Sequence, residues 1–287
     1  MVISLVKTIA MVNLSYNKNR LLPSAEELPC SDETPVDNQL QNDIPNLLLS
    51  LLAFIWMERD DWYFGVDMGI YYNPDEPAII PDGFLAIGVK HDTGERGRLS
   101  YVLWEEAYIM PILALEVISE KYNGEYEGKL ADYQTLGILY YAIYNPLSGR
   151  RGRFKNRERL EVYKLIAGKY ELLEPENNRV WLPEIGLALG YEQGEHIAWV
   201  REWLYWYDQS GNRYLTAEER ARAAAAIAAQ ERLNAQQERL NAQQERLAKQ
   251  AAEAIAEQER FAKQQAEQKA QRLAERLRSL GINPDEM

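Results

Sequence analysis

The sequence of 287 residues contains one cysteine, Cys30, and two histidines, His91 and His196. A single cysteine cannot form a disulfide within the chain, so we expect a reducing compartment, the cytoplasm. No Cys/His cluster is available for a zinc site, and we expect both histidines to have structural or surface roles. Cys30 stands in a polar segment beside no evident base, which gives no indication of a cysteine nucleophile.

Long apolar runs are also missing. No stretch approaches the roughly 18 residues that a membrane-spanning helix needs. The N-terminal apolar stretch ends at Lys7 and lacks the basic start of a signal peptide. Met11 is an alternative start to Met1. The sequence therefore predicts a protein without membrane anchorage.

Aromatic residues are absent after Tyr214, although the chain has 7 Trp and 18 Tyr. Charge divides at the same place: acidic and basic residues balance from Ala217 onward, so the preceding part carries the whole net charge of −12. Phosphate is repelled by such an acidic surface at long range, which argues against strong non-specific binding to nucleic acid.

These breaks predict three segments: a loosely ordered segment 1–36, a folded domain 37–215 and a helical tail 216–287. Within the domain, apolar residues at helical spacing indicate a core-facing helix from about Asp43, its N-cap, to Glu58, with Pro45 in the first turn. A second helix is expected over 125–135. Apolar stretches and turn residues predict strands over 62–72, 78–88, 111–119 and 138–146, and hairpins over 159–174 and 205–215. This order predicts an α/β domain with a mixed sheet.

The tail begins with a capping box, Thr216 to Glu219, and continues in a heptad repeat in which ERLNAQQ occurs twice over 231–244. A helix closed by Gly281 would be roughly 95 Å long. Only one position per heptad is apolar, where a sound coiled coil has two. We interpret the tail as a weak coiled coil able to form a homodimer, or as a single helix without a specific partner.

Three acidic residues and one lysine could carry chemistry. Asp82 and Glu116 lie in apolar strands, where a carboxylate is costly unless it is paired or bound to a cation. Glu125 and Lys129 are one helical turn apart on the following helix. Two carboxylates on adjacent strands suit Mg²⁺ or Mn²⁺, and a nearby ammonium could stabilise charge on phosphate. The alternative is a turn aspartate, a solvent-facing glutamate and a surface ion pair.

The order of the motifs Pro81-Asp82, LEVIS around Glu116, and Glu125-x-x-x-Lys129-x-x-x-Tyr133 resembles that of the Uma-type restriction endonucleases. This family, abundant in cyanobacteria, belongs to the PD-(D/E)XK, restriction-endonuclease-like superfamily, and the resemblance extends from about Asp37 to Glu219. It implies a restriction-endonuclease-like mixed β-sheet flanked by helices and followed by the long C-terminal helix.

The resemblance also implies roles for the site residues. Asp82 and Glu116 would be metal ligands, and Glu125 an auxiliary acid. The superfamily usually places its lysine two residues after the glutamate. Ile118 occupies that position here, so the role would pass to Lys129. An acid from the first helix is often added in the superfamily, and here the candidates are Gln41, Asn42 and Asp43.

The sequence thus supports two hypotheses. The first is a Mg²⁺- or Mn²⁺-dependent endonuclease acting on DNA. The second is a nuclease-like protein that no longer cuts and acts as an interaction or scaffold protein dimerising through its tail. The complete set of Asp82, Glu116 and Lys129 favours the first, and the acidic domain and repetitive tail favour the second.

Overall fold

The structure is a computed structural model, and the chain divides into two units, Met1–Glu219 and Arg220–Met287. The residues described are 16–17, 20–29, 38–91, 94–149, 154–279 and 281. The sequence predictions for Met1, Met11 and Cys30 lie outside these residues.

A mixed six-stranded sheet forms the centre of the first unit, with strand order β1-β3-β5-β6-β7-β8. Within this sheet, β5 and β6 are the only neighbouring strands that run parallel. A three-stranded antiparallel sheet, β11-β10-β9, and a short parallel pair, β2-β4, complete it. The predicted α/β class with a mixed sheet is confirmed. The helices and strands of this unit are α1 (Gln39–Ile55), β1 (Trp62–Val66), β2 (Ile70–Tyr71), β3 (Gly83–Ile87), β4 (Tyr101–Val102), β5 (Leu113–Val117), α2 (Gly128–Leu136), β6 (Tyr140–Tyr144), β7 (Leu160–Ile166), β8 (Lys169–Leu172), β9 (Arg179–Leu182), β10 (Leu187–His196) and β11 (Trp199–Tyr207).

Helix α1 packs against both sheets. Four of its leucines, Leu47, Leu48, Leu51 and Leu52, are buried in a core cluster that also contains side chains of β5 and β11. The Trp206 indole N–H of β11 donates to the Leu48 carbonyl of α1 at 3.2 Å. The two sheets are thereby held through one shared helix, which fixes the first turn of α1 beside β5.

Strand β5 separates two cores, because successive side chains point to opposite faces. Leu113, Leu115 and Val117 belong to the cluster that contains α1. The intervening Ala114 and the following Ile118 belong to a second cluster that contains residues of α2. Glu116 therefore faces the α2 side, where helix α2 crosses between the parallel strands β5 and β6.

The predicted first helix was misplaced at its start. Asn38 is the N-cap, and its side chain accepts a hydrogen bond from Leu40 N at 2.8 Å. Helix α1 therefore begins before Asp43, and Pro45 lies inside it instead of in the first turn. Asparagine satisfies a free N–H as well as aspartate does, so Asp43 was not required as the cap.

The predicted hairpin over 205–215 is only partly correct. Its turn forms, with Gly211 N donating to Asp208 O, but only an isolated bridge joins Tyr207 and Arg213. Strand β11 pairs instead with β10 through a turn at Ile197 and Ala198, which have φ of 47° and 58°. Neither isoleucine nor alanine is typical of a left-handed turn, so residue types do not predict this turn.

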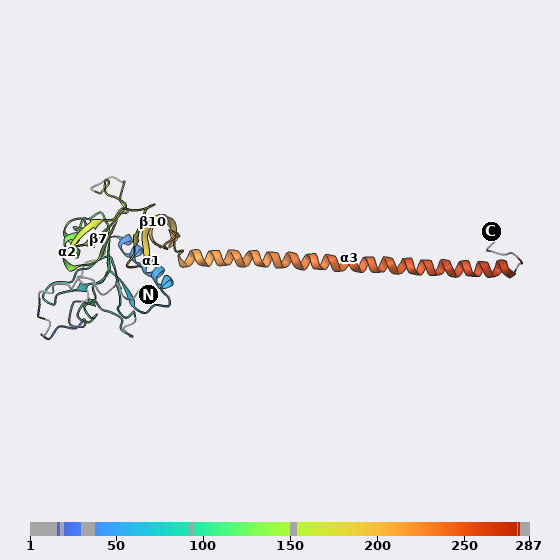
Figure 1. Ribbon diagram of the computed structural model, residues 1–287, viewed down its shortest axis with the longest axis horizontal. Coiled ribbons are helices and arrows are strands. Elements are labelled where there is room, and N and C mark those ends of the chain that lie inside the picture. Colours follow the sequence, from blue (N-terminus) through green and yellow to red (C-terminus); the bar gives the residue numbers. More distant parts are fainter. Residues whose placement is uncertain are drawn as a thin grey trace. The chain divides into compact units, whose positions relative to one another are not determined.

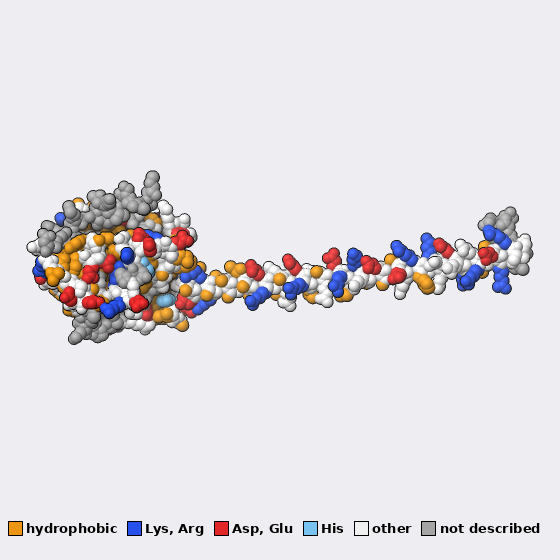
Figure 2. Space-filling view, turned by 90° about the horizontal axis from the view of Figure 1, so that it is seen from below, with side chains coloured by type: hydrophobic (Ala, Val, Ile, Leu, Met, Phe, Trp, Pro, Cys, Tyr) orange, Lys and Arg blue, Asp and Glu red, His pale blue; other side chains and the backbone are white. Residues whose placement is uncertain are grey.

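Helix α3 (Ala217–Ser279) forms most of the tail, as predicted (Figure 1). The capping box is present: Glu219 N donates to Thr216 Oγ1, and Thr216 N donates to a Glu219 carboxylate oxygen. None of the described side chains of α3 is buried, and the heptad leucines are at least half exposed. Acidic, basic and scattered hydrophobic side chains follow one another along it (Figure 2). Among the described residues, no helix is both long and apolar enough to span a membrane.

Candidate metal and phosphodiester site

Asp82 and Glu116 face each other across neighbouring strands. Gly83 of β3 pairs with Leu115 of β5 in antiparallel register, so the preceding Asp82 lies opposite the following Glu116. The Val117 N–H donates to Asp82 Oδ2 at 2.6 Å, which ties the aspartate to the strand carrying the glutamate. Directly opposed residues of an antiparallel pair lie on the same face of the sheet. The structure thus brings together the two carboxylates that the sequence suggested.

The Glu116 carboxylate is 1% exposed and is held at both oxygens from helix α2. Lys129 Nζ lies 2.8 Å from Oε2, and the Tyr133 hydroxyl donates to Oε1 at 2.7 Å. Lys129 and Tyr133 are four residues apart and share one face of the helix. No role for the Tyr133 hydroxyl follows from the sequence, although Tyr133 is the last residue of the Glu125-x-x-x-Lys129-x-x-x-Tyr133 motif that carries the family resemblance. Its place in that motif was the signal.

Burial and mutual repulsion disfavour two negative charges here. Burial, together with the charge of Glu116, raises the pKa of Asp82 well above its ordinary value. Burial also raises the pKa of Glu116, although Lys129 and Tyr133 oppose the rise. Burial lowers the pKa of Lys129, but the charge and hydrogen bond of Glu116 outweigh it, so the pKa stands above its ordinary value. Lys129 is therefore an ammonium at neutral pH.

Glu125 is buried beside the site but does not pair with Lys129. Helix α2 begins at Gly128, later than predicted, so Glu125 lies in the turn before it. Its carboxylate accepts the Asn123 N–H at 3.1 Å, and its charge contributes to the raised pKa of Glu116. The surface Glu125–Lys129 pair considered from the sequence is replaced by the Lys129–Glu116 pair.

Of the three first-helix candidates, Gln41 is the one in contact with the strand that bears Glu116. Its buried side-chain amide donates to the Val117 carbonyl at 3.3 Å. Asn42 is exposed and accepts a hydrogen bond from the Asn46 amide. Asp43 lies one position further along α1. The first helix thus contacts the strand that bears Glu116 through a neutral amide, at the backbone of the following residue.

The donor set fits a hard divalent cation. Among the described residues, no group of three or more His, Cys, Asp and Glu side chains is arranged to hold a metal. Asp82 and Glu116 nevertheless offer carboxylate oxygens, and burial together with the charge of Glu116 raises the pKa of Asp82. A cation between them would offset this rise. One or two carboxylates with retained waters are typical of Mg²⁺ sites.

The two histidines lie outside this site. The His91 ring packs on Trp62, and the His196 ring packs on Trp203.

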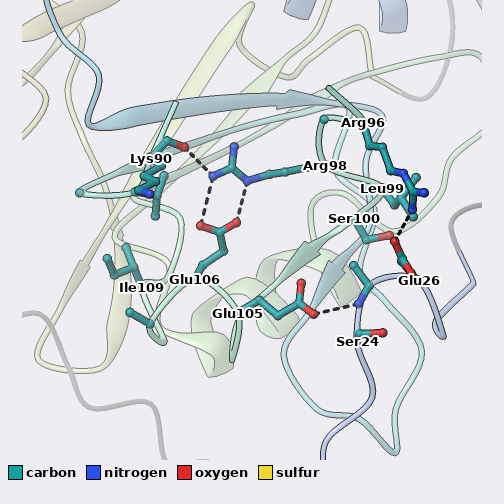
Figure 3. A pocket seen from close by; sticks show the side chains of 15 residues that line it. Ser24, Glu26, Lys90, Arg96, Arg98, Leu99, Ser100, Glu105, Glu106 and Ile109 are labelled. Carbon is teal, nitrogen blue, oxygen red and sulfur yellow. Dashed lines mark hydrogen bonds and ion pairs between the residues drawn. The ribbon is translucent and has the colours of Figure 1, made fainter. Parts of the chain in front are cut away.

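A separate cavity of about 660 Å³ lies at the other end of β3, beside Gly88. Figure 3 shows its centre, where Arg98 bonds both oxygens of Glu106 and the Lys90 carbonyl. Arg98 also lies over the Tyr63 ring. None of the residues that line the cavity belongs to the carboxylate site. The cavity is therefore not part of the candidate catalytic centre.

Residues 32–198, more than half of the chain, match the Uma2 family, which is described as "Putative restriction endonuclease". The chain belongs to the Uma2 family. No curated protein matches it. Membership agrees with the resemblance drawn from the motifs and with the mixed sheet, and the matched range contains Asp82, Glu116 and Lys129. A nuclease-like function on DNA follows from the family, and the chemistry of this member is argued below.

Proposed function

We propose that this Uma2 protein is a metal-dependent endonuclease that hydrolyses DNA phosphodiester bonds. Asp82 and Glu116 hold Mg²⁺ or Mn²⁺, and Lys129 acts at the scissile phosphate. The convergence of these three side chains, from the residue before β3, from β5 and from α2, is the observation that supports the proposal. A lone buried carboxylate would be costly, and the ammonium and facing aspartate make the arrangement suited to cation and phosphate binding.

A bound divalent cation would polarise a phosphoryl oxygen and acidify a bound water. The protein's own groups provide the rest of the chemistry. Tyr133 and Lys129 fix the Glu116 carboxylate in one orientation, so that little reorganisation is needed when substrate arrives. Because Lys129 keeps its proton, it stabilises negative charge on the phosphoryl group and does not act as a base.

The test is cleavage of supercoiled and linear DNA with Mg²⁺ or Mn²⁺, using the parent and Glu116→Gln. Glutamine keeps the size of the side chain but removes its charge, and we expect cleavage to fall at least about 100-fold. The matched control is Glu106→Gln, which neutralises a carboxylate outside the site, one that is paired with the buried side chain of Arg98. Equal cleavage by a folded Glu116→Gln protein and the parent would rule out this site.

A second candidate is an interaction protein that does not cut and is dimerised by its tail. The observation in its favour is helix α3, whose heptad residues Leu233, Leu240 and Leu247 are exposed at spacings of seven. The net charge of −12 is also unfavourable for DNA binding. A parent protein that dimerises but neither binds a divalent cation nor cleaves DNA would establish this function instead.

A further inference from the structure

A groove lies beside the proposed catalytic site, where strands β5 and β6 end. It consists of two hollows of about 440 and 370 Å³ that share the lining residues Leu40, Pro146, Leu147 and Trp199. Because four side chains belong to both hollows, they form one continuous groove. Its walls come from the first turn of α1, the segments after β5 and β6, and the β10–β11 hairpin.

The position of the groove connects it to Glu116. Ile118 to Lys121 follow the end of β5, starting two residues after Glu116, and line one end of the groove. Pro146 and Leu147 follow the parallel strand β6. In α/β sheets, ligands bind outside the carboxyl ends of parallel strands, where the chain leaves adjacent strands in different directions. A ligand in the groove would therefore lie at the edge of the sheet that presents Glu116.

Trp199 differs from the other tryptophans of its strand. Trp203 and Trp206 are fully buried in the core, whereas Trp199 is 41% exposed and lines both hollows. Its ring meets Trp203 edge-on at 5.8 Å, and its carbonyl accepts the Trp203 indole N–H at 3.1 Å. Trp199 is thus fixed in place while much of its surface stays accessible.

The charged side chains that line the groove are three cations, Lys121, Arg159 and Arg201, and two acids, Glu120 and Glu202, so the cations are in excess although the chain as a whole is acidic. The Arg201 guanidinium lies 5.0 Å from the Trp199 ring centre and 5.2 Å from that of Trp203. Lys121 is exposed at the end near Glu116 and has no ion-pair partner among the described residues. Arg159 pairs with Glu202 in the wall. Cations alternating with an accessible aromatic face suit a single nucleic-acid strand, whose backbone is anionic and whose bases stack.

We infer that the groove binds an unpaired DNA strand, with one base stacked on Trp199 and the backbone directed past Lys121 toward Glu116. This inference rests on the proposed nuclease function and specifies its substrate: DNA with a single-stranded or unstacked segment. In an intact duplex the faces of the bases are stacked on one another, so Trp199 has nothing to stack on. When an unpaired strand is bound, the apolar residues Leu40 and Leu147 contact its sugars and base edges instead of water.

The test measures binding of a fluorescein-labelled oligothymidylate and of a labelled blunt duplex by fluorescence anisotropy, in EDTA so that no cleavage occurs. We expect Trp199→Ala to weaken oligothymidylate binding about 5- to 150-fold, the loss typical of one stacked base. Trp199→Phe should restore most of it. The matched control is Trp181→Ala on β9, because Trp181 is 39% exposed and lines neither hollow.

Each outcome separates the groove from the catalytic site. If Trp199→Ala, folded by circular dichroism, binds oligothymidylate like the parent, the groove assignment is overturned while cleavage by the parent still supports the nuclease. The assignment is also overturned if Trp181→Ala loses as much affinity, or if the parent binds neither DNA. Trp199-dependent binding by a parent that never cleaves would support the groove and overturn the proposed catalytic function.

Discussion

Lys129 of α2 donates to Glu116 of β5 across 2.8 Å, whereas the restriction-endonuclease-like superfamily usually has its lysine two residues after the glutamate. That position holds Ile118, which is buried in the core beneath α2. A lysine there would place an ammonium among apolar side chains, at high cost. Moving the cation to the next helix keeps it beside Glu116 while its side chain stays 26% exposed.

Divalent cation binding tests the carboxylate pair directly. We expect Mn²⁺ to bind the parent and not Asp82→Ala, as measured by titration calorimetry. Protons compete with the cation for carboxylates whose pKa values are raised, so binding should strengthen as pH rises through those values. Glu106→Gln should bind like the parent. Retention of binding in Asp82→Ala would move the metal elsewhere.

The pH dependence of stability gives a second test without metal. The folded pKa of Asp82 is raised, so the folded protein binds more protons than the unfolded chain between the ordinary value of 3.8 and the folded value. The free energy of unfolding contributed by Asp82 is therefore full at low pH and is lost as pH rises through the folded pKa. Urea unfolding in EDTA at several pH values should show this loss in the parent and a smaller one in Asp82→Asn. An identical pH profile would contradict the raised pKa.

Removing the Tyr133 hydroxyl should affect both stability and the carboxylate. Tyr133→Phe deletes a buried hydrogen bond to a charged group, and we expect a loss of about 1.5–3 kcal/mol in unfolding free energy. The pKa of Glu116 should rise further, because Tyr133 lowers it, so Mn²⁺ binding should shift to higher pH. Tyr170→Phe removes a hydrogen bond to the Ile138 carbonyl and is the control. It should lower stability without moving the Mn²⁺ profile.

Truncation separates the domain from its tail. A chain ending at Ala226 keeps Glu219, which receives two hydrogen bonds from Arg213 at 2.7 and 2.8 Å. We expect this chain to unfold cooperatively, and a chain ending at Thr216 to be less stable by about 1.5–3 kcal/mol. Analytical ultracentrifugation should show less self-association of the Ala226 chain than of the full chain, if α3 forms a dimer. Aggregation of both truncated chains would make the tail part of the folded core.

Local patterns predicted the central elements of the fold. The heptads of α3, the β7–β8 turn at Gly168 and the apolar stretch of β6 were all apparent in the sequence, because each depends on nearby residues. The β10–β11 hairpin was missed because Ile197 and Ala198 turn the chain at positive φ without glycine or asparagine. Its register depends on packing against α1, which lies more than 100 residues away.

The candidate site was predictable to a similar degree. Asp82 and Glu116 attracted attention because a carboxylate in an apolar strand needs a reason to be there. Tyr133 did not, since its hydroxyl acquires a role only when α2 lies over β5. Gln41 could not be separated from its neighbours, because an N-cap expected at Asp43, five residues after the actual N-cap Asn38, leaves Gln41 outside the helix and its facing unassigned.

The identical heptads of α3 make the length of the tail adjustable. Recombination between the two ERLNAQQ copies would add or remove seven residues, and thus about 10.5 Å of helix. The change rotates the following residues by only about 20°, so the leucines stay nearly in line. Since no described side chain of α3 is buried, no packing would be lost. The reach of the tail can therefore evolve in fixed increments while the nuclease-like domain stays unaltered.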